Sequence, residues 1–283
     1  MWKYSRMLVV GIMLVIMNMS CEEKKMSEVK NPLPSIASVG EPAWQTLAQK
    51  RIYFGHQSVG NNILEGIKDV MNEHRNIKLN IVQIAAPTDI KSPMLGHSRI
   101  GKNVDPRSKV QEFAALMSAG IGENTDVAFF KFCYVDVTAK TDVEKLYKGY
   151  KDAMDTLRKL YPKTAIIHVT VPLTVSKTSM KTRLKKLLGK KEMWEYDDNV
   201  RRNEFNELLR KEYQGKQPLF DLARIESTYP DGTRSSFTKG ENTYDSLVPE
   251  YTYDGGHLNE KGRRVVAEAL LVFLANLNAK SSS

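Results

Sequence analysis

The sequence predicts a single α/β domain, a three-layer α/β/α sandwich built around a central parallel sheet. From Lys50 onward, short apolar runs alternate with longer segments whose apolar residues recur at helical spacing. Strands that alternate with helices of this length form parallel sheets covered on both faces. No internal repeat and no second domain boundary interrupts the alternation, and 283 residues are compatible with one large domain.

The expected strands are apolar runs bounded by polar or turn-forming residues. They are residues 51–54, 78–86, 126–135, 164–171 and 217–222, of which DVAFFKFCYV (126–135) has the strongest strand character. Residues 87–105 and 223–256 are expected to be long loops. Ligands of open parallel sheets bind beyond the carboxyl ends of the strands, where such loops gather.

The expected helices are residues 58–74, 106–120, 141–161, 197–213 and 259–277. In the first of them, Ile63, Ile67 and Val70 recur at the spacing of one helix face. Pro106 is a favourable first helical residue behind Asp105 as N-cap. Pro162 ends the third helix, because its ring does not fit a helix interior.

Residues 1–21 have the plan of a secretory signal, with two basic residues, an apolar core and then Ser20-Cys21. A cysteine after a small residue resembles a bacterial lipoprotein box, in which Cys21 becomes the lipidated mature N-terminus. An uncleaved membrane anchor is the alternative. Residues 22–48 are expected to form a polar tether and residues 49–280 the folded domain. In either case the domain lies outside the cytoplasm, in the cell envelope, at the periplasm or outer membrane.

Charge and cysteine content limit the partners. The formal net charge of +9 falls to about +7 once the two basic residues of 1–21 are removed. Such a diffuse charge suits an anionic envelope polymer or a membrane surface and does not indicate nucleic acid. Apart from Cys21, Cys133 is the only cysteine, so a lipidated chain has no intramolecular disulfide.

Three residue types with complementary chemistry fall at expected strand ends. Ser58 follows the first strand, and Asp254 and His257 precede the last helix. A serine hydroxyl becomes nucleophilic when a base removes its proton, and the base needs a carboxylate to orient it. Taken alone, Ser58 could be a helix cap and Asp254-Gly-Gly a simple turn. Together the three predict a catalytic triad.

This arrangement resembles the SGNH, or GDSL-type, serine hydrolase superfamily, over roughly residues 51–277. The first family block is a strand, a Gly-Asp-Ser turn and a helix, and FGHQS here is one residue longer. The last block is Asp-x-x-His, matched by Asp254 and His257. The resemblance implies a flavodoxin-like parallel sheet, Ser58 as nucleophile and no cofactor. It also implies an oxyanion hole formed by the N–H of Ser58 and of a glycine, for which Gly101 is the first candidate and Gly96 the second.

The third family block, Gly-x-Asn-Asp, is divergent. Cys133 stands at the glycine, Val135 at the asparagine and Asp136 at the aspartate. Valine cannot donate the side-chain hydrogen bond that the asparagine gives to the oxyanion, and one such donor contributes about 3–4 kcal/mol. The side chains that could donate in place of the asparagine are Asn61, Asn103 and Tyr134.

The remaining polar candidates are weaker. His56, where the family has aspartate, could contact substrate together with His97 and Arg99 from the loop 87–105. A metal site formed by His56, His97 and His257 has no ligand-spacing motif behind it, so we expect none. The lysine-rich residues 177–191 are interpreted as a solvated face, with a lid or an anion-binding strip as the alternative.

The sequence therefore predicts a lipid-anchored envelope esterase whose substrate is an O-acylated or O-acetylated carbohydrate or another acylated small molecule. Two alternatives stay open. One is an O-acyltransferase, which uses the same triad with a sugar hydroxyl in place of water. The other is a catalytically weak carbohydrate-binding lipoprotein that keeps the fold.

Overall fold

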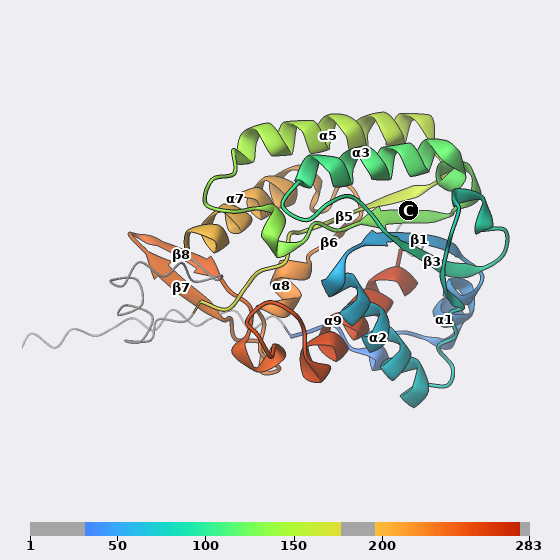
Figure 1. The fold of residues 1–283 in the computed structure, drawn as a ribbon. Helices are drawn as coiled ribbons and strands as arrows, with labels where there is room; N and C mark the ends of the chain where they lie inside the picture. The colour runs from blue at the N-terminus through green and yellow to red at the C-terminus, as the bar shows by residue number, and fades with distance from the viewer. Residues whose placement is uncertain (1–31, 177–195, 278–283) are drawn as a thin grey trace, which may run out of the picture.

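The computed structural model describes residues 32–176 and 196–277 of the chain. Its centre is a parallel six-stranded sheet with the strand order β2-β3-β1-β4-β5-β6 (Figure 1). The strands are β1 (Arg51–His56), β2 (Ile81–Gln83), β3 (Met94–Arg99), β4 (Val127–Phe130), β5 (Ala165–Val169) and β6 (Leu219–Phe220). The predicted three-layer α/β/α sandwich is confirmed.

Helices cover both faces of the sheet (Figure 1). On one face lie α1 (Glu41–Ala48), α2 (Ser58–Glu73), α8 (Leu222–Glu226) and α9 (Glu260–Ala275), and on the other α3 (Pro106–Leu116), α5 (Val143–Leu160) and α7 (Tyr196–Tyr213). The short helical segments are η1 (Ile36–Ser38), η2 (Pro87–Asp89), η3 (Met117–Ile121), α4 (Gly122–Asn124), η4 (Tyr134–Asp136) and η5 (Pro249–Tyr251). Each face buries its own apolar core against the sheet.

Helices α2 and α9 pack unusually closely. This contact brings an early and a late segment of the chain together. A Cβ atom added to Gly66 would lie 2.3 Å from the backbone oxygen of Arg263, so only glycine permits this contact. Arg263 also donates to Asp69 of α2, at 2.8 Å. Just before α9, the Leu258 N–H donates to Asn62 Oδ1 on the first turns of α2, at 3.3 Å.

The prediction of a loop over residues 87–105 is wrong at its centre. Residues Met94–Arg99 form β3, which pairs in parallel with β1 along its whole length. The sequence MLGHSR lacks the continuous apolar run that would mark a buried strand. At Gly96 the apolar cover comes instead from Ile90, whose side chain occupies the place where another residue would have its Cβ atom. The strand predicted at 78–86 is reduced to β2 at the edge of the sheet.

The predicted tether, residues 22–48, is wrong over its second half. Residues 41–48 form α1, and its Trp44 and Leu47 are buried in the core beside α9. Ile36 joins the same core. The folded domain therefore begins before residue 49, and Pro42 marks the first turn of a helix and not an extended linker.

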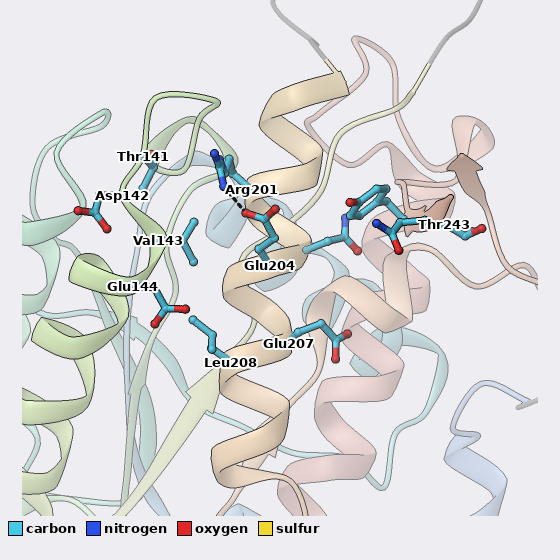
Figure 2. Close-up of a pocket in the computed structure, with 12 residues that line it drawn as sticks. Thr141, Asp142, Val143, Glu144, Arg201, Glu204, Glu207, Leu208 and Thr243 are labelled. Atoms are coloured by element: carbon cyan, nitrogen blue, oxygen red, sulfur yellow. Dashed lines mark hydrogen bonds and ion pairs between the residues drawn. The ribbon is translucent and has the colours of Figure 1, made fainter. Parts of the chain in front are cut away.

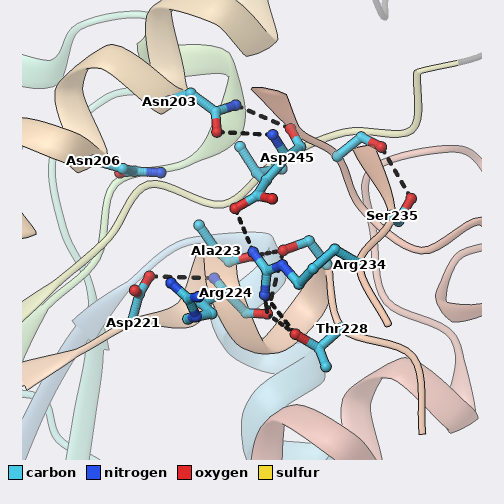
Figure 3. Close-up of polar contacts among 12 residues, drawn as sticks. Asn203, Asn206, Asp221, Ala223, Arg224, Thr228, Arg234, Ser235 and Asp245 are labelled. Atoms are coloured by element: carbon cyan, nitrogen blue, oxygen red, sulfur yellow. Dashed lines mark hydrogen bonds and ion pairs between the residues drawn. The ribbon is translucent and has the colours of Figure 1, made fainter. Parts of the chain in front are cut away.

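The predicted loop 223–256 is also more ordered than expected. It contains α8, the antiparallel hairpin of β7 (Ser236–Lys239) with β8 (Asn242–Asp245), and η5. Figure 3 shows the polar contacts that hold its base: Arg234 pairs with Asp245 and donates to the backbone oxygen of Arg224 at 2.7 Å. Asn203 of α7 bonds both backbone groups of Asp245. Polar contacts at the base of the hairpin thus add to the apolar packing of this segment, whose Leu247, Val248 and Tyr251 are buried in the core beside α9.

Several expectations lie outside the described residues. They are the signal at 1–21 with Cys21, the first part of the tether, the lysine-rich stretch 177–191 and the last residues of the domain. Of the helices in the described ranges, none combines the length and the apolar character that a membrane span requires.

Candidate active site

Strand β1 and helix α2 together present Ser58. β1 ends at His56, Gln57 is the N-cap residue and Ser58 is the first residue of α2. The Gln57 side-chain amide donates to the backbone oxygens of Ile100 and Gly101, at 2.8 and 2.9 Å, which joins this turn to the end of β3. Gln57, not Ser58, therefore occupies the cap position, and the alternative that Ser58 merely caps the helix is not supported.

Ser58, His257 and Asp254 form a continuous hydrogen-bonded chain. Ser58 Oγ lies 3.0 Å from His257 Nε2, and His257 Nδ1 lies 2.7 Å from Asp254 Oδ2. With the Asp254 carboxylate as acceptor, Nδ1 carries the proton, and Nε2 is left to accept from the serine hydroxyl. The structure brings together the three residues that the sequence predicts as a triad.

Asp254 also organises the loop that carries it. Its Oδ1 accepts the backbone N–H groups of Gly256 and His257, at 3.0 and 2.9 Å. Partial burial alone would raise the pKa of Asp254, but the hydrogen bonds from the His257 ring and from these backbone groups lower the pKa below its ordinary value. The carboxylate is therefore ionised at neutral pH, as an orienting group requires.

The first turn of α2 offers free hydrogen-bond donors beside Ser58. The first intrahelical bond runs from the Gly60 N–H to the Gln57 oxygen, at 2.9 Å. The N–H groups of Ser58 and Val59 precede it and find no acceptor among the described residues. Such groups, at the positive end of a helix dipole, favour a negative charge.

The structure contradicts Gly101 as an oxyanion donor. Gly101 follows β3 with φ +58°, and its N–H donates to the Glu112 carboxylate at 2.7 Å. A donor that already serves a carboxylate is not available to an oxyanion. Gly96, the second candidate, lies inside β3 beneath Ile90 and cannot serve either.

Of the proposed replacement donors, only Tyr134 reaches the triad. Its hydroxyl oxygen lies 3.3 Å from Nδ1 and 3.4 Å from Nε2 of His257. Asn103 uses its Oδ1 to accept from Lys109 Nζ at 3.0 Å, and within the two described ranges no hydrogen bond joins Asn103 or Asn61 to Ser58 or His257. These two asparagines stay predictions.

The divergent third block is held by a buried ion pair that the sequence reasoning missed. Asp136 pairs with Lys109 of α3, and both side chains are fully buried. Asp136 also accepts the N–H groups of Cys133 and Val104, at 2.6 and 3.0 Å. Asp136 therefore joins the turn after β4 both to α3, through Lys109, and to the loop after β3, through Val104. A buried lysine cannot be recognised from the sequence, because its surroundings depend on both loops.

The predicted substrate contact by His56 is also contradicted. His56 is 1% exposed, and both of its ring nitrogens are occupied, by the Gln57 oxygen at 2.8 Å and by His97 Nδ1 at 3.0 Å. Burial lowers the pKa of His56 to about 4 and also lowers that of His97. The two neutral imidazoles form a structural pair between β1 and β3. His97 is half-buried and Arg99 exposed, so both stay candidates for substrate contact.

The expectation on metal ligands can be compared only over the described residues. There, no group of three or more histidine, cysteine, aspartate or glutamate side chains has the arrangement of a metal site. His56 and His97 bond each other, whereas His257 bonds Ser58 and Asp254.

Figure 2 shows a separate cavity of about 760 Å³. It is lined by the start of α5, one face of α7 and strand β8, including Glu144, Glu204 and Thr243. Figure 2 shows Arg201 bonded to Glu204 at its rim, at 2.7 Å. None of the triad residues lines this cavity.

The geometry above agrees with the sequence comparison. Residues 53–270 match the family of GDSL-like lipases and acylhydrolases. This span is well over half of the chain, so the protein belongs to that family, and the predicted resemblance is confirmed. No curated protein matches the chain.

Solved structures give only distant likenesses. An acetyl xylan esterase, AlAXEase, shares 18% identity with a TM-score of 0.41, over 77% of this chain and 96% of that one. The periplasmic domain of a lipopolysaccharide acetyltransferase from Salmonella ser. Paratyphi A shares 10% with a TM-score of 0.45, over 79% and 83%. A carbohydrate esterase family 3 protein from Talaromyces cellulolyticus shares 13% with a TM-score of 0.39, over 82% and 98%. These values carry no argument about substrate.

Proposed function

We propose that the protein is a serine esterase with Ser58 as nucleophile, His257 as general base and Asp254 as the orienting carboxylate. One observation carries the proposal: Ser58 Oγ, the His257 ring and the Asp254 carboxylate follow one another at 3.0 and 2.7 Å. A nucleophile within hydrogen-bonding distance of an oriented base is the geometry that acyl transfer requires.

In the proposed reaction, His257 Nε2 takes the Ser58 proton as Oγ attacks the ester carbonyl. The N–H groups of Ser58 and Val59 stabilise the tetrahedral oxyanion, with the α2 dipole behind them. His257 then gives its proton to the leaving alcohol, and an acyl-serine remains. A water molecule, deprotonated by His257, attacks this ester and releases the acid and free Ser58.

We further propose that the enzyme acts in the cell envelope, anchored through a lipid on Cys21, on O-acyl or O-acetyl groups of a carbohydrate. The sequence of residues 1–21 supports the anchor, and the positive net charge suits an anionic polymer or surface. The family as a whole acts on ester bonds, which supports the reaction type but does not choose the substrate.

A catalytically weak carbohydrate-binding protein is the second candidate. Two observations favour it: Val135 replaces the donor residue of the third block, and the Gly101 N–H is occupied by Glu112. With two of the family's oxyanion donors lost, the remaining donors would have to stabilise the transition state alone.

A fluorophosphonate probe separates the two candidates, because it labels only an activated serine. The full chain should be labelled at Ser58, as located by peptide mass, and should turn over an aryl acetate. Ser58→Ala and His257→Ala should abolish both. Ser98→Ala is the matched control, since Ser98 lies near the end of β3 and its hydroxyl bonds that of Tyr53 at 2.8 Å. A folded wild-type chain that resists labelling would favour the binding protein.

A further inference from the structure

Tyr134 contacts His257 in a way that the triad itself does not require. The two rings are nearly perpendicular, at 79°, with centroids 5.5 Å apart. The hydroxyl oxygen is almost equidistant from Nδ1 and Nε2, at 3.3 and 3.4 Å. An oxygen in the ring plane at these distances would overlap Cε1, which lies between the two nitrogens. The hydroxyl therefore covers one face of the imidazole, while Asp254 and Ser58 occupy its edge.

We propose that Tyr134 is a positioning residue that holds the His257 ring in line with Ser58. The inference rests on the proposed function, because it assigns Tyr134 a part in preparing the base of that reaction. It gives the divergent third block a role: the block contributes a support for the base where relatives contribute an asparagine.

The His257 ring gets little support from its own loop beyond Asp254. The loop backbone is bonded, since the Gly255 oxygen accepts from the Val175 N–H at 2.9 Å and the Gly256 N–H donates to Asp254 Oδ1 at 3.0 Å, but these bonds do not touch the ring. Asp254 sits on the same loop, so it moves with the ring that it orients. The side chains of His257 and Asp254 are 38% and 45% exposed. Tyr134 comes from the turn after β4 and ties the ring to the body of the sheet.

Tyr134 is itself fixed by a buried arginine. Arg202 of α7, 1% exposed, donates from Nε to the backbone oxygens of Tyr134 and Val137, at 2.8 and 3.1 Å. Its guanidinium also lies 5.9 Å from the centre of the Tyr134 ring, within cation–π distance. A series of contacts therefore connects α7 to Tyr134 and Tyr134 to His257.

The hydroxyl suits both protonation states of the base. Tyr134 is 4% exposed, and burial raises its pKa further above the ordinary value, so it is a neutral hydroxyl at neutral pH. A tyrosine hydroxyl both donates and accepts, so it can present its hydrogen to a neutral ring or its lone pairs to an imidazolium. The contact can therefore persist while His257 takes up and releases the serine proton.

Tyr134→Phe tests the inference, because it removes the oxygen and keeps the ring. In the full chain we expect kcat on an aryl acetate and the rate of fluorophosphonate labelling to fall about 10- to 100-fold, since small displacements of catalytic groups cost rates of this size. KM should change less than about twofold, because Tyr134 does not bind substrate in this proposal.

Tyr150→Phe is the matched control. Tyr150 is also buried, and its hydroxyl lies 2.8 Å from Nδ1 of His168, in the core on the other side of the sheet. Its removal should lower the melting temperature but leave kcat and labelling unchanged. If Tyr134→Phe lowers the melting temperature and likewise leaves kcat and labelling unchanged, Tyr134 is only structural and the inference is wrong.

A second measurement does not depend on activity. Long-range ¹H–¹⁵N spectra of the histidine rings report which nitrogen carries the proton. Through the Nε2 shift, they also report whether that nitrogen accepts a hydrogen bond. The wild type should show the Nδ1–H tautomer with Nε2 bonded to Ser58, and Tyr134→Phe should keep the tautomer, because Asp254 sets it, but lose the hydrogen-bonded Nε2 shift. An unchanged Nε2 shift in Tyr134→Phe overturns the inference. If the shift moves in the variant but the wild type is never labelled at Ser58, positioning stands and the proposed function fails.

Discussion

Asp254 makes two kinds of contact with the same loop, to the His257 ring and to two backbone N–H groups. Replacement of Asp254 by asparagine would keep the shape of the side chain and change its chemistry. The asparagine amide can donate to Nδ1, so the ring would carry its proton on Nε2 and face Ser58 with a donor instead of an acceptor.

We therefore expect Asp254→Asn to lower kcat about 10³- to 10⁴-fold with little change in KM. Steady-state turnover of an aryl acetate and the fluorophosphonate labelling rate measure the effect. A melting temperature close to that of the wild type would show that the loop is intact. Full activity in this variant would mean that Asp254 does not orient the base.

His56 makes stability depend on pH. Burial lowers its pKa from 6.5 to about 4, so the folded chain binds fewer protons than the unfolded chain between these values. The contribution is present above about pH 6.5 and is lost as the pH falls toward 4, on the order of 3 kcal/mol in all. His168, which is buried in the other core with a pKa of about 4, adds a similar dependence.

In His56→Gln, the loss of unfolding free energy between pH 7.5 and 5 should be smaller than in the wild type, because His56 no longer contributes while His97 and His168, whose pKa values burial also lowers, still do. Glu226, whose pKa burial raises to about 8, contributes with the opposite sign in both proteins. Urea denaturation at several pH values gives this slope. His168→Gln is the counterpart from the opposite face and should show the same reduction. Equal slopes in all three proteins would show that neither histidine is held neutral.

Among the secondary-structure elements, the contact of α2 with α9 matters most for the site. Gly66→Ala would drive a methyl group into the Arg263 backbone, since the Cβ atom would lie 2.3 Å from its oxygen. We expect a loss of about 1–3 kcal/mol in the free energy of unfolding, as in other overpacked contacts. Because the helices must separate, His257 should also shift from Ser58, so kcat should fall as well.

Gly149→Ala in α5 is the control, because a Cβ atom there meets nothing within 4 Å. Alanine at this exposed helical position should stabilise the chain by about 0.5–1 kcal/mol and leave kcat unchanged. Thermal unfolding and aryl acetate turnover of both variants give the comparison. A stable, fully active Gly66→Ala would show that the helices are not as close as described.

Whether a feature could be predicted from the sequence depends on whether it is set within one element or by contacts between elements. Ser58, Asp254 and His257 were found because each lies in a short local pattern at a strand or helix boundary. β3 was missed because its strand character comes from pairing with β1 and not from its own composition. Everything that depends on β3 was lost with it: the His56–His97 pair needs the parallel register of the two strands.

The oxyanion donors show a second limit. The order of residues places Gly101 after a strand, but the carboxylate that accepts its N–H belongs to Glu112, 11 residues later in α3. Likewise, Tyr134 could be named as a candidate donor, whereas its position over the His257 ring depends on Arg202 from α7. Contacts between side chains of distant elements are not encoded in local patterns.

For the molecule as a whole, the N-terminal boundary of the domain is open to a direct test. A chain that starts at residue 49 would lack α1. The apolar surface of α9 that α1 covers, with Trp44 only 2% exposed, would then face solvent. We expect it to be less stable than a chain that starts at residue 32 by at least about 3–5 kcal/mol, the usual effect of deleting a large buried side chain. Trp44→Ala in the full chain should lose a similar amount.

Thermal and urea unfolding of the two truncated chains provide the measurement. A mutation of the exposed Glu41 in the same helix, Glu41→Gln, controls for changes of charge and should stay within about 0.5 kcal/mol of the wild type. Equal stability of the two truncated chains would restore the boundary at residue 49.

Ser58 and His257 are 199 residues apart in the chain, and α9, which follows the histidine loop, is the last helix within the described residues. A partly folded chain can form the strand, the turn and the helix around Ser58 before any base is in place to take the serine proton. The hydroxyl would stay as unreactive as that of an ordinary serine until α9 packs on α2. Under the proposed function, a chain that has not finished folding would therefore be silent toward esters.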